Sequence, residues 1–134
     1  MVKKDLVHLK AASIYSKLSK CQRKQVGCVA VRDDRIVATG INGTITGQPN
    51  KCEDAEGNTL PTVVHSEMNL ICFCAREGIS LKDTILYLTL SPCIVCAKLI
   101  VVAGIKKVFY SEEYRDNSGI KYLNSINFKI EKEI

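Results

Sequence analysis

The chain has 134 residues, a formal net charge of +5, 46% hydrophobic residues and 25% charged residues. These values are typical of one globular domain and exclude a disordered or repetitive chain. The first residues lack the apolar core of a signal peptide, and no stretch reaches the roughly 18 consecutive apolar residues of a membrane span. We therefore expect one cytoplasmic domain, residues 1–134, whose moderate charge permits an anionic substrate without indicating one.

The chain is rich in cysteine. The seven cysteines are Cys21, Cys28, Cys52, Cys72, Cys74, Cys93 and Cys96. Because no secretory signal accompanies them, we expect a reducing compartment, with the cysteines acting as metal ligands or core residues. An odd number also excludes complete disulfide pairing within one chain.

The first half of the chain predicts a helix, a hairpin and a long loop. Residues 3–19 space apolar side chains at helical intervals, which predicts an amphipathic helix. Residues 26–31 and 36–40 are short apolar runs around a polar turn, which predicts a β-hairpin. Residues 40–61 are rich in Gly, Pro and Asn, so we expect a loop that is functional or mobile.

The second half alternates helices and strands. Residues 66–76 favour a helix that ends at Gly78, and residues 85–90 form a strand that is apolar on both faces. A second helix is expected over residues 93–103 and then a strand at 107–110. A short helix near 120–126 and a strand at 128–130 follow. This order predicts a three-layer α/β/α domain with a mixed sheet of about five strands.

Two short segments carry metal-binding chemistry. Pro92 precedes Cys93 and Cys96, which are three residues apart and share one face of the first turn of a helix. A helix N-terminus favours the thiolate form that a metal needs. His65, at the start of the other helix, completes three zinc ligands and leaves the fourth tetrahedral position open, as catalytic zinc sites require.

Glu67 follows His65 by two residues, which places the two side chains on different sides of a helix. We therefore expect Glu67 to remain outside the ligand set and to act as a general acid and base that carries a proton from water to the substrate. Together the segments have the form H-x-E…P-C-x-x-C, the pattern of zinc-dependent nucleobase deaminases.

Simpler interpretations exist for the single elements. A lone C-x-x-C is typical of structural zinc sites or redox pairs, and a lone H-x-E occurs by chance. We interpret Cys28, Cys72 and Cys74 as core residues and His8 as an ordinary residue of a helix surface.

From about Ser19 to Tyr114 the chain resembles the deoxycytidylate (dCMP) deaminases of the cytidine deaminase-like superfamily. The resemblance lies in residues 19–27 (SKCQRKQVG), 40–47 (GINGTITG), 65–69 (HSEMN) and 90–93 (LSPC). It implies the cytidine deaminase-like fold and hydrolytic deamination of dCMP to dUMP and ammonia. It also implies one catalytic Zn²⁺ on His65, Cys93 and Cys96, with Glu67 as the proton shuttle.

The resemblance further implies a substrate site. Asn42 would hold the sugar, and the basic segment, residues 20–24, and the aromatic and polar segment, residues 110–115, would lie near other nucleotide groups. The residues expected to contact substrate are Asn42, Lys20, Arg23, Ser91 and Tyr114.

Members of this family are commonly hexamers that dCTP activates and dTTP inhibits. Their effector region corresponds to the glycine-rich loop, and the effector residues expected here are Gly43, Thr44, Gly47 and Asn50. Ile41 and Ile45 stand where the family usually has tyrosine and proline, which leaves the effector response open.

Some viral members carry a second, structural zinc on cysteines like Cys21 and Cys52 together with histidines. Here His8 and His65 are the only histidines, so the resemblance does not complete a second site.

Three alternatives remain. The same chemistry suits another cytosine-type base or nucleoside deaminase. A nucleic-acid-editing deaminase would use the positive charge on a phosphate backbone, but there is no tryptophan and no basic run interleaved with aromatic residues. A non-enzymatic zinc fold would have no need of Glu67.

Overall fold

The computed structural model describes all residues from Met1 to Ile134. Its elements are α1 (Lys3–Ser16), β1 (Gly27–Arg32), β2 (Arg35–Ile41), α2 (Ser66–Glu77), β3 (Ile85–Leu90), α3 (Ile94–Val102), β4 (Lys107–Glu112), α4 (Ser118–Ser125) and β5 (Lys129–Lys132). The five strands form one sheet in the order β2-β1-β3-β4-β5. Strand β1 runs antiparallel to β2 and β3, whereas β3, β4 and β5 are parallel. The predicted mixed sheet is confirmed.

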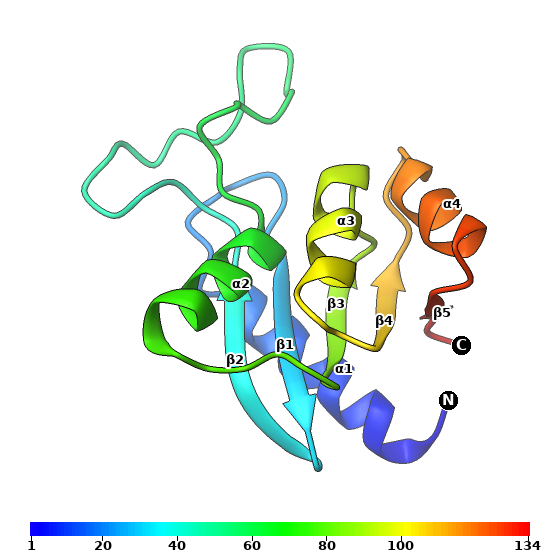
Figure 1. Cartoon of the computed structure of the whole chain (residues 1–134). Coiled ribbons are helices and arrows are strands. Elements are labelled where there is room, and N and C mark those ends of the chain that lie inside the picture. The colour runs from blue at the N-terminus through cyan, green and yellow to red at the C-terminus, as the bar shows by residue number, and fades with distance from the viewer.

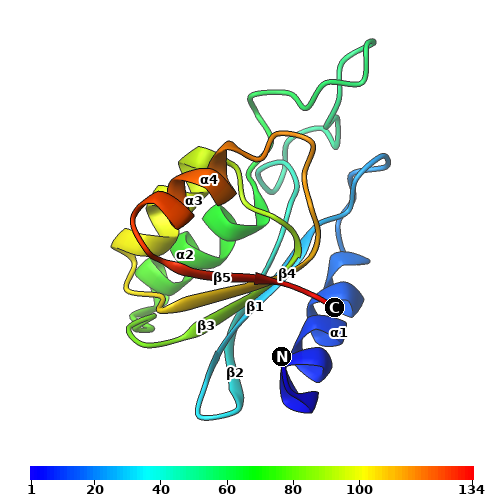
Figure 2. The same cartoon turned by 90° about the vertical axis from the view of Figure 1, so that its right-hand side faces the viewer.

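Helices cover both faces of the sheet (Figures 1 and 2). Helix α1 lies alone on one face, and α2, α3 and α4 lie side by side on the other. Because successive strand residues point to opposite faces, β1 and β3 supply both layers of the core. Leu86 and Leu88 pack toward α2 and α3, while Tyr87 and Val29 pack toward α1. Strand β3 is therefore central and buried on both faces, as its apolar sequence predicts.

Helix α1 ends at Ser16, earlier than predicted, and it buries a narrower stripe than expected. Leu9 and Ala12 are buried, but Ile14 and Leu18 remain exposed. The buried stripe also includes Asp5, whose Oδ1 accepts a hydrogen bond of 2.7 Å from the Tyr87 hydroxyl. The buried residues Asp5, Leu9, Ala12 and Ser16 are four, three and four positions apart, so they lie in one line along the helix, and this line faces the sheet.

The cysteines do not all behave as expected. Cys28 and Cys74 are buried, as predicted, but Cys72 is exposed. Cys72 and Cys74 are two residues apart on α2, so they point to nearly opposite sides of the helix and only one can face the core. His8 is half-buried, and its ring centroid lies 5.1 Å from that of Tyr87.

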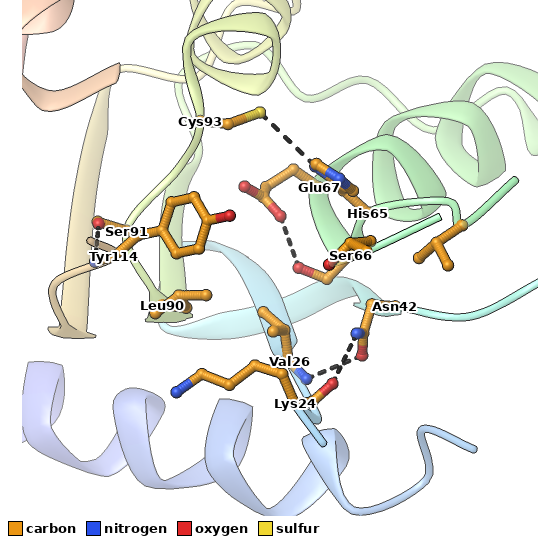
Figure 3. A pocket seen from close by; sticks show the side chains of 12 residues that line it. Lys24, Val26, Asn42, His65, Ser66, Glu67, Leu90, Ser91, Cys93 and Tyr114 are labelled. Atoms are coloured by element: carbon orange, nitrogen blue, oxygen red, sulfur yellow. Dashed lines mark hydrogen bonds between the residues drawn. The ribbon is translucent and has the colours of Figure 1, made fainter. Parts of the chain in front are cut away.

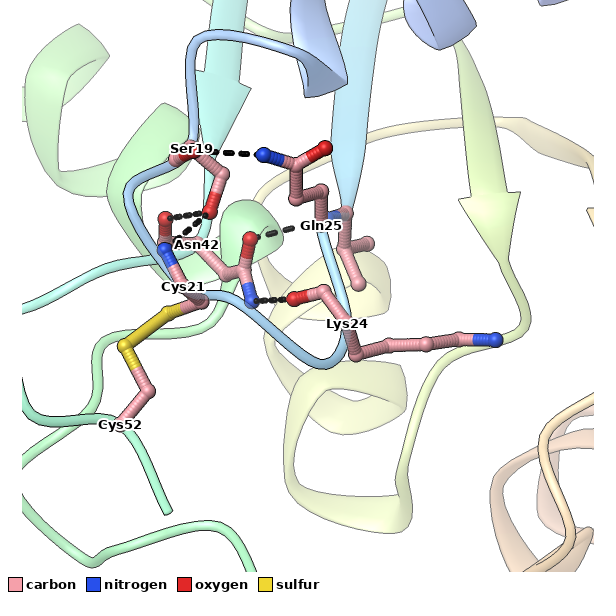
Figure 4. The surroundings of a disulfide bond; sticks show 7 residues. Ser19, Cys21, Lys24, Gln25, Asn42 and Cys52 are labelled. Carbon is pink, nitrogen blue, oxygen red and sulfur yellow. Dashed lines mark hydrogen bonds between the residues drawn. A yellow bond between two sulfur atoms is a disulfide. The ribbon is translucent and has the colours of Figure 1, made fainter.

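The long connection between β2 and α2 extends beyond the end of the sheet (Figure 1). It contains only isolated bridges, Gly43 with Val64 and Glu53 with Thr59, which agrees with its loop composition. A disulfide between Cys21 and Cys52, with Cα atoms 5.6 Å apart, ties this connection to the segment before β1 (Figure 4). This bond corrects the expectation that the cysteines serve only as metal ligands or core residues. No helix has the length and apolar character needed to span a membrane.

Candidate active site

The candidate site lies where α2 and α3 begin. His65 is the N-cap of α2 and Cys93 is the N-cap of α3. Both helices start at the end of the sheet where β2 and β3 finish, since both strands are antiparallel to β1. Ligand sites of open α/β sheets gather at this end. The site residues therefore stand on the first turns of two helices that pack on the core.

Three ligand atoms converge there. The Nδ1 atom of His65 lies 3.6 Å from the sulfur of Cys93 and 3.5 Å from the sulfur of Cys96. In a tetrahedral zinc site, a sulfur at about 2.3 Å and a nitrogen at about 2.0–2.1 Å from the metal lie about 3.6 Å from each other. All three atoms lie within 4.8 Å of one another. The side chains present therefore fit a tetrahedral zinc ion with one open position.

The electrostatics of the group suit a cation. The hydrogen bond from the Cys96 thiol lowers the pKa of Cys93 to about 4, and a bond from His65 contributes to the same shift. The contact with Cys93, together with burial, raises the pKa of Cys96. The bond to Cys93 raises the pKa of His65. The protein alone thus stabilises one thiolate, and a dication would favour the second thiolate and the neutral imidazole.

Glu67 lies in the first turn of α2 beside this group and is only 4% exposed. It is not one of the three residues whose ligand atoms converge. Its Oε1 accepts a hydrogen bond of 2.7 Å from the Ser66 hydroxyl (Figure 3). Burial raises the pKa of Glu67, so the carboxyl group holds a proton more readily than an exposed one.

A cavity of about 90 Å³ opens onto these side chains. The residues that line it are Lys24, Val26, Asn42, Thr59, Val63, His65, Ser66, Glu67, Leu90, Ser91, Cys93 and Tyr114. Metal-type ligands and a buried carboxylate thus share one small cavity with polar and apolar walls, which is the usual make-up of a small-molecule site.

Three of the predicted substrate residues line this cavity. Asn42 accepts a hydrogen bond of 2.8 Å from the backbone N–H of Val26 and donates one of 2.8 Å to the carbonyl oxygen of Lys24. Its amide therefore fixes the segment that enters β1. Ser91 accepts a bond of 2.7 Å from the backbone N–H of Tyr114, which holds that residue at the cavity.

The other two predicted substrate residues lie outside this cavity. The guanidinium of Arg23 lies against Gly57 of the long connection. Lys20 lines a separate cavity, described below. Lys24, on the same basic segment, lines the active-site cavity, and its ammonium lies 3.0 Å from Oε2 of Glu112. Sequence periodicity could not select Lys24, because the segment between α1 and β1 has no regular structure.

A second cavity of about 490 Å³ lies against the glycine-rich loop. Its lining includes the four predicted effector residues Gly43, Thr44, Gly47 and Asn50. Lys20 and Arg76 add two positive charges to the same lining. The structure therefore brings the predicted effector residues together in one hollow that is separate from the metal ligands.

Comparison with known proteins places these features in a family. The family model for the cytidine and deoxycytidylate deaminase zinc-binding region matches residues 1–112. The deoxycytidylate deaminase of Saccharomyces cerevisiae is 33% identical over 136 residues, which cover 94% of this chain and 43% of the yeast protein. That of Mycobacterium phage D29 is 33% identical over 123 residues, which cover 81% of this chain and 94% of the phage protein.

The chain spans 43%, 53% and 38% of the length of three curated relatives that it matches, so these relatives extend well beyond it. Among solved structures, the dCMP deaminase from the cyanophage S-TIM5 in complex with dCMP and dUMP is 38% identical, with a TM-score of 0.93 over 99% of both chains. Because the family model covers most of the chain, this protein belongs to the cytidine and deoxycytidylate deaminase family.

Proposed function

We propose that residues 1–134 form one domain that converts dCMP and water to dUMP and ammonia, with one Zn²⁺ bound by His65, Cys93 and Cys96. The observation that carries this proposal is that these three ligand atoms converge, and that two of the ligands, His65 and Cys93, line one cavity together with the separate carboxylate of Glu67. The similarity along the whole chain to the cyanophage enzyme in complex with dCMP and dUMP supports the choice of substrate.

The residues divide the chemistry between them. A zinc ion bound to the three ligands supplies Lewis acidity, which lets water lose a proton near neutral pH. Glu67 takes this proton and passes it to the ring nitrogen N3, where it stays in the product. Glu67 then carries the second proton, from the new hydroxyl on C4, to the departing amine, which leaves as ammonia. The oxygen of water forms a bond to C4 of the cytosine ring, and the bond between C4 and the exocyclic nitrogen breaks. The raised pKa of Glu67 suits a group that holds the proton between these steps.

Residues on the connections hold the nucleotide. We assign the sugar to Asn42, which lines the cavity, and Ser91 holds Tyr114 at the same cavity through its hydrogen bond. Lys24 is the only lysine or arginine that lines the cavity, so we assign the phosphate to it, with the phosphate taking the place of Glu112. Lys20 and Arg23 lie outside this cavity, and their positive charges attract the anionic substrate toward it.

The experiment is a chromatographic assay of the purified, zinc-loaded protein. The substrates are dCMP, dCTP, cytidine, cytosine and single-stranded DNA. We expect ammonia and dUMP from dCMP with the highest kcat/KM. Protein that holds one zinc per chain and releases no ammonia from dCMP would refute the substrate. Turnover of cytidine or of DNA instead would favour the corresponding alternative.

We also propose that dCTP activates the enzyme and dTTP inhibits it by binding in the second cavity. The support is the grouping of Gly43, Thr44, Gly47 and Asn50 with the cationic Lys20 and Arg76 in one hollow. The test is dCMP turnover with each triphosphate in the wild type and in an Arg76→Ala variant. A response that is absent from the wild type, or equal in both proteins, would reject this site.

A hexamer is the assembly that we propose. The supporting observation is the set of exposed apolar side chains on the outer surface of α3, which includes Ile94, Val95 and Val102. Light scattering coupled to gel filtration gives the mass directly, and a monomer across the working concentration range would reject assembly.

A further inference from the structure

Ser66 stands between the ligand His65 and the carboxylate Glu67 and is 1% exposed. Its hydroxyl donates a hydrogen bond of 2.7 Å to Oε1 of Glu67. No other side chain in the protein hydrogen-bonds to this carboxylate. In Figure 3 the second carboxylate oxygen points away from Ser66 toward the side where Cys93 and Tyr114 lie. One oxygen is therefore held by the protein, and the other faces the side of the cavity where Cys93 lies.

The backbone of Ser66 is itself fixed. It is the first residue of α2, and a side chain at Gly40 of β2 would collide with its carbonyl oxygen. This close approach of strand and helix leaves no room for the start of α2 to shift toward β2. The position of the hydroxyl is thus set by the core and not by solvent.

A glutamate has three side-chain torsions, so a free carboxylate samples several positions. Proton transfer needs the carboxylate within hydrogen-bonding reach of its partner, and a misplacement of about 1 Å lowers a rate by about a hundredfold. A hydrogen-bond donor on the neighbouring residue restricts the last torsion of Glu67. The alternative is that Ser66 only fills buried space, in which case alanine would serve as well.

We propose that Ser66 is a positioning residue, which orients the Glu67 carboxylate for proton transfer through the bond from its hydroxyl to Oε1. This inference rests on the proposed deaminase function. Ser66 acts only through Glu67, so its effect falls on the chemical step and leaves substrate binding and metal binding unchanged.

The first test is Ser66→Ala. We expect kcat for dCMP to fall by about ten- to a hundredfold with KM within twofold of the wild type and zinc content unchanged. The matched control is Thr84→Val, which removes a buried hydroxyl at the opposite end of β3. We expect its kcat to equal that of the wild type. A Ser66→Ala variant with wild-type kcat would overturn the proposal.

A double-mutant cycle separates positioning from a general structural effect. In a Glu67→Gln background, Ser66→Ala should cause no further loss of the residual rate. An equal loss in both backgrounds would show that Ser66 acts independently of the carboxylate, and would overturn the proposal.

A crystal structure of zinc-loaded Ser66→Ala gives a readout that does not depend on turnover. We expect the Glu67 side chain to occupy more than one rotamer in the variant and one rotamer in the wild type. A single, unchanged rotamer in both would overturn the proposal. A wild-type protein that fails to deaminate dCMP would refute the function, while this crystallographic comparison would still decide the role of Ser66.

Discussion

The residues proposed for catalysis and the residues proposed for substrate recognition lie on two different kinds of structure. The metal ligands and Glu67 stand on the first turns of α2 and α3, whose bodies bury Leu70 and Ile100 completely against the sheet. The residues proposed to contact the nucleotide lie mostly on the segment before β1 and on the β2–α2 connection. These segments lack regular structure beyond isolated bridges.

The recognition region, which consists of the segment before β1 and the β2–α2 connection, is held in place by a few specific interactions. The Asn42 amide bonds to the backbone at Lys24 and Val26, and the Cys21–Cys52 disulfide joins the two segments (Figure 4). Reacting groups need fixed geometry, which a packed core supplies, whereas recognition residues on connections can change without disturbing that core. Changes in the two regions should therefore have separable effects.

The largest effect is expected from removing a ligand. Cys96 is fully buried at the metal group, so Cys96→Ser should abolish zinc binding at micromolar concentration and reduce deamination to background. Zinc content by elemental analysis and dUMP formation by chromatography measure the two losses. A variant that keeps one zinc per chain would move Cys96 out of the ligand set.

The second largest effect is expected from removing the Cys21–Cys52 disulfide, which joins the segment before β1 to the β2–α2 connection. The disulfide closes a loop with a sequence separation of 31 residues. Loop-closure entropy for such a loop corresponds to about 3–4 kcal/mol. Replacing both cysteines, Cys21→Ala with Cys52→Ala, should lower the free energy of unfolding in guanidinium by about this amount. It should raise KM for dCMP more than it lowers kcat. Unchanged stability, or a loss confined to kcat, would contradict the division into two regions.

Far from the site, a buried hydrogen bond from Tyr87 to Asp5 depends on the ionisation of the Asp5 carboxyl group. Burial opposes ionisation of Asp5, but the hydrogen bonds from the Tyr87 hydroxyl and from the Val2 backbone lower its pKa below the ordinary value of 3.8. A lowered pKa in the folded state stabilises the protein above pH 3.8, and this stabilisation is lost as the pH falls through the folded-state pKa.

Tyr87→Phe should therefore lower the free energy of unfolding by about 1.5–3 kcal/mol at pH 7 and by less at pH 3. Denaturant titrations at the two pH values measure the difference, and kcat at pH 7 should not change. A destabilisation that is equal at both pH values would show that the bond to ionised Asp5 is not its source.

The smallest effect is expected at the rim of the cavity. Lys24 is half exposed and pairs with Glu112, so its contact with a phosphate is partly screened by solvent. Lys24→Ala should raise KM for dCMP about tenfold and leave kcat near the wild-type value. Lys10→Ala, which removes an exposed lysine of α1, is the matched control. An equal KM in both variants would exclude Lys24 as the phosphate contact.

The sequence predicts the first region much better than the second. The continuous apolar run of residues 85–90 indicates a buried strand, and Pro92 before Cys93 indicates the start of a helix directly after it. This local pattern is enough to place Cys93 and Cys96. The ends of α2 near Gly78 and of α3 near Gly104 can also be predicted, because glycine readily adopts the positive φ found at both positions.

The connections carry no such periodicity. Nothing in the spacing of Cys21 and Cys52 shows that their Cα atoms lie 5.6 Å apart, since that depends on the path of the whole loop. The resemblance likewise predicts that the basic segment, residues 20–24, lies near the nucleotide. The sequence does not show that Lys24 lines the cavity while Arg23 lies against Gly57, because that depends on the path of an irregular segment.

The central claim is that Glu67 carries protons and does not bind the metal. Its most direct test is Glu67→Gln, a variant of nearly equal shape, examined for zinc content and for single-turnover conversion of dCMP. The account predicts one zinc per chain and a rate lowered by about 10² to 10⁴, the usual contribution of a general acid and base. Loss of the zinc, or a rate within a few fold of the wild type, would contradict it.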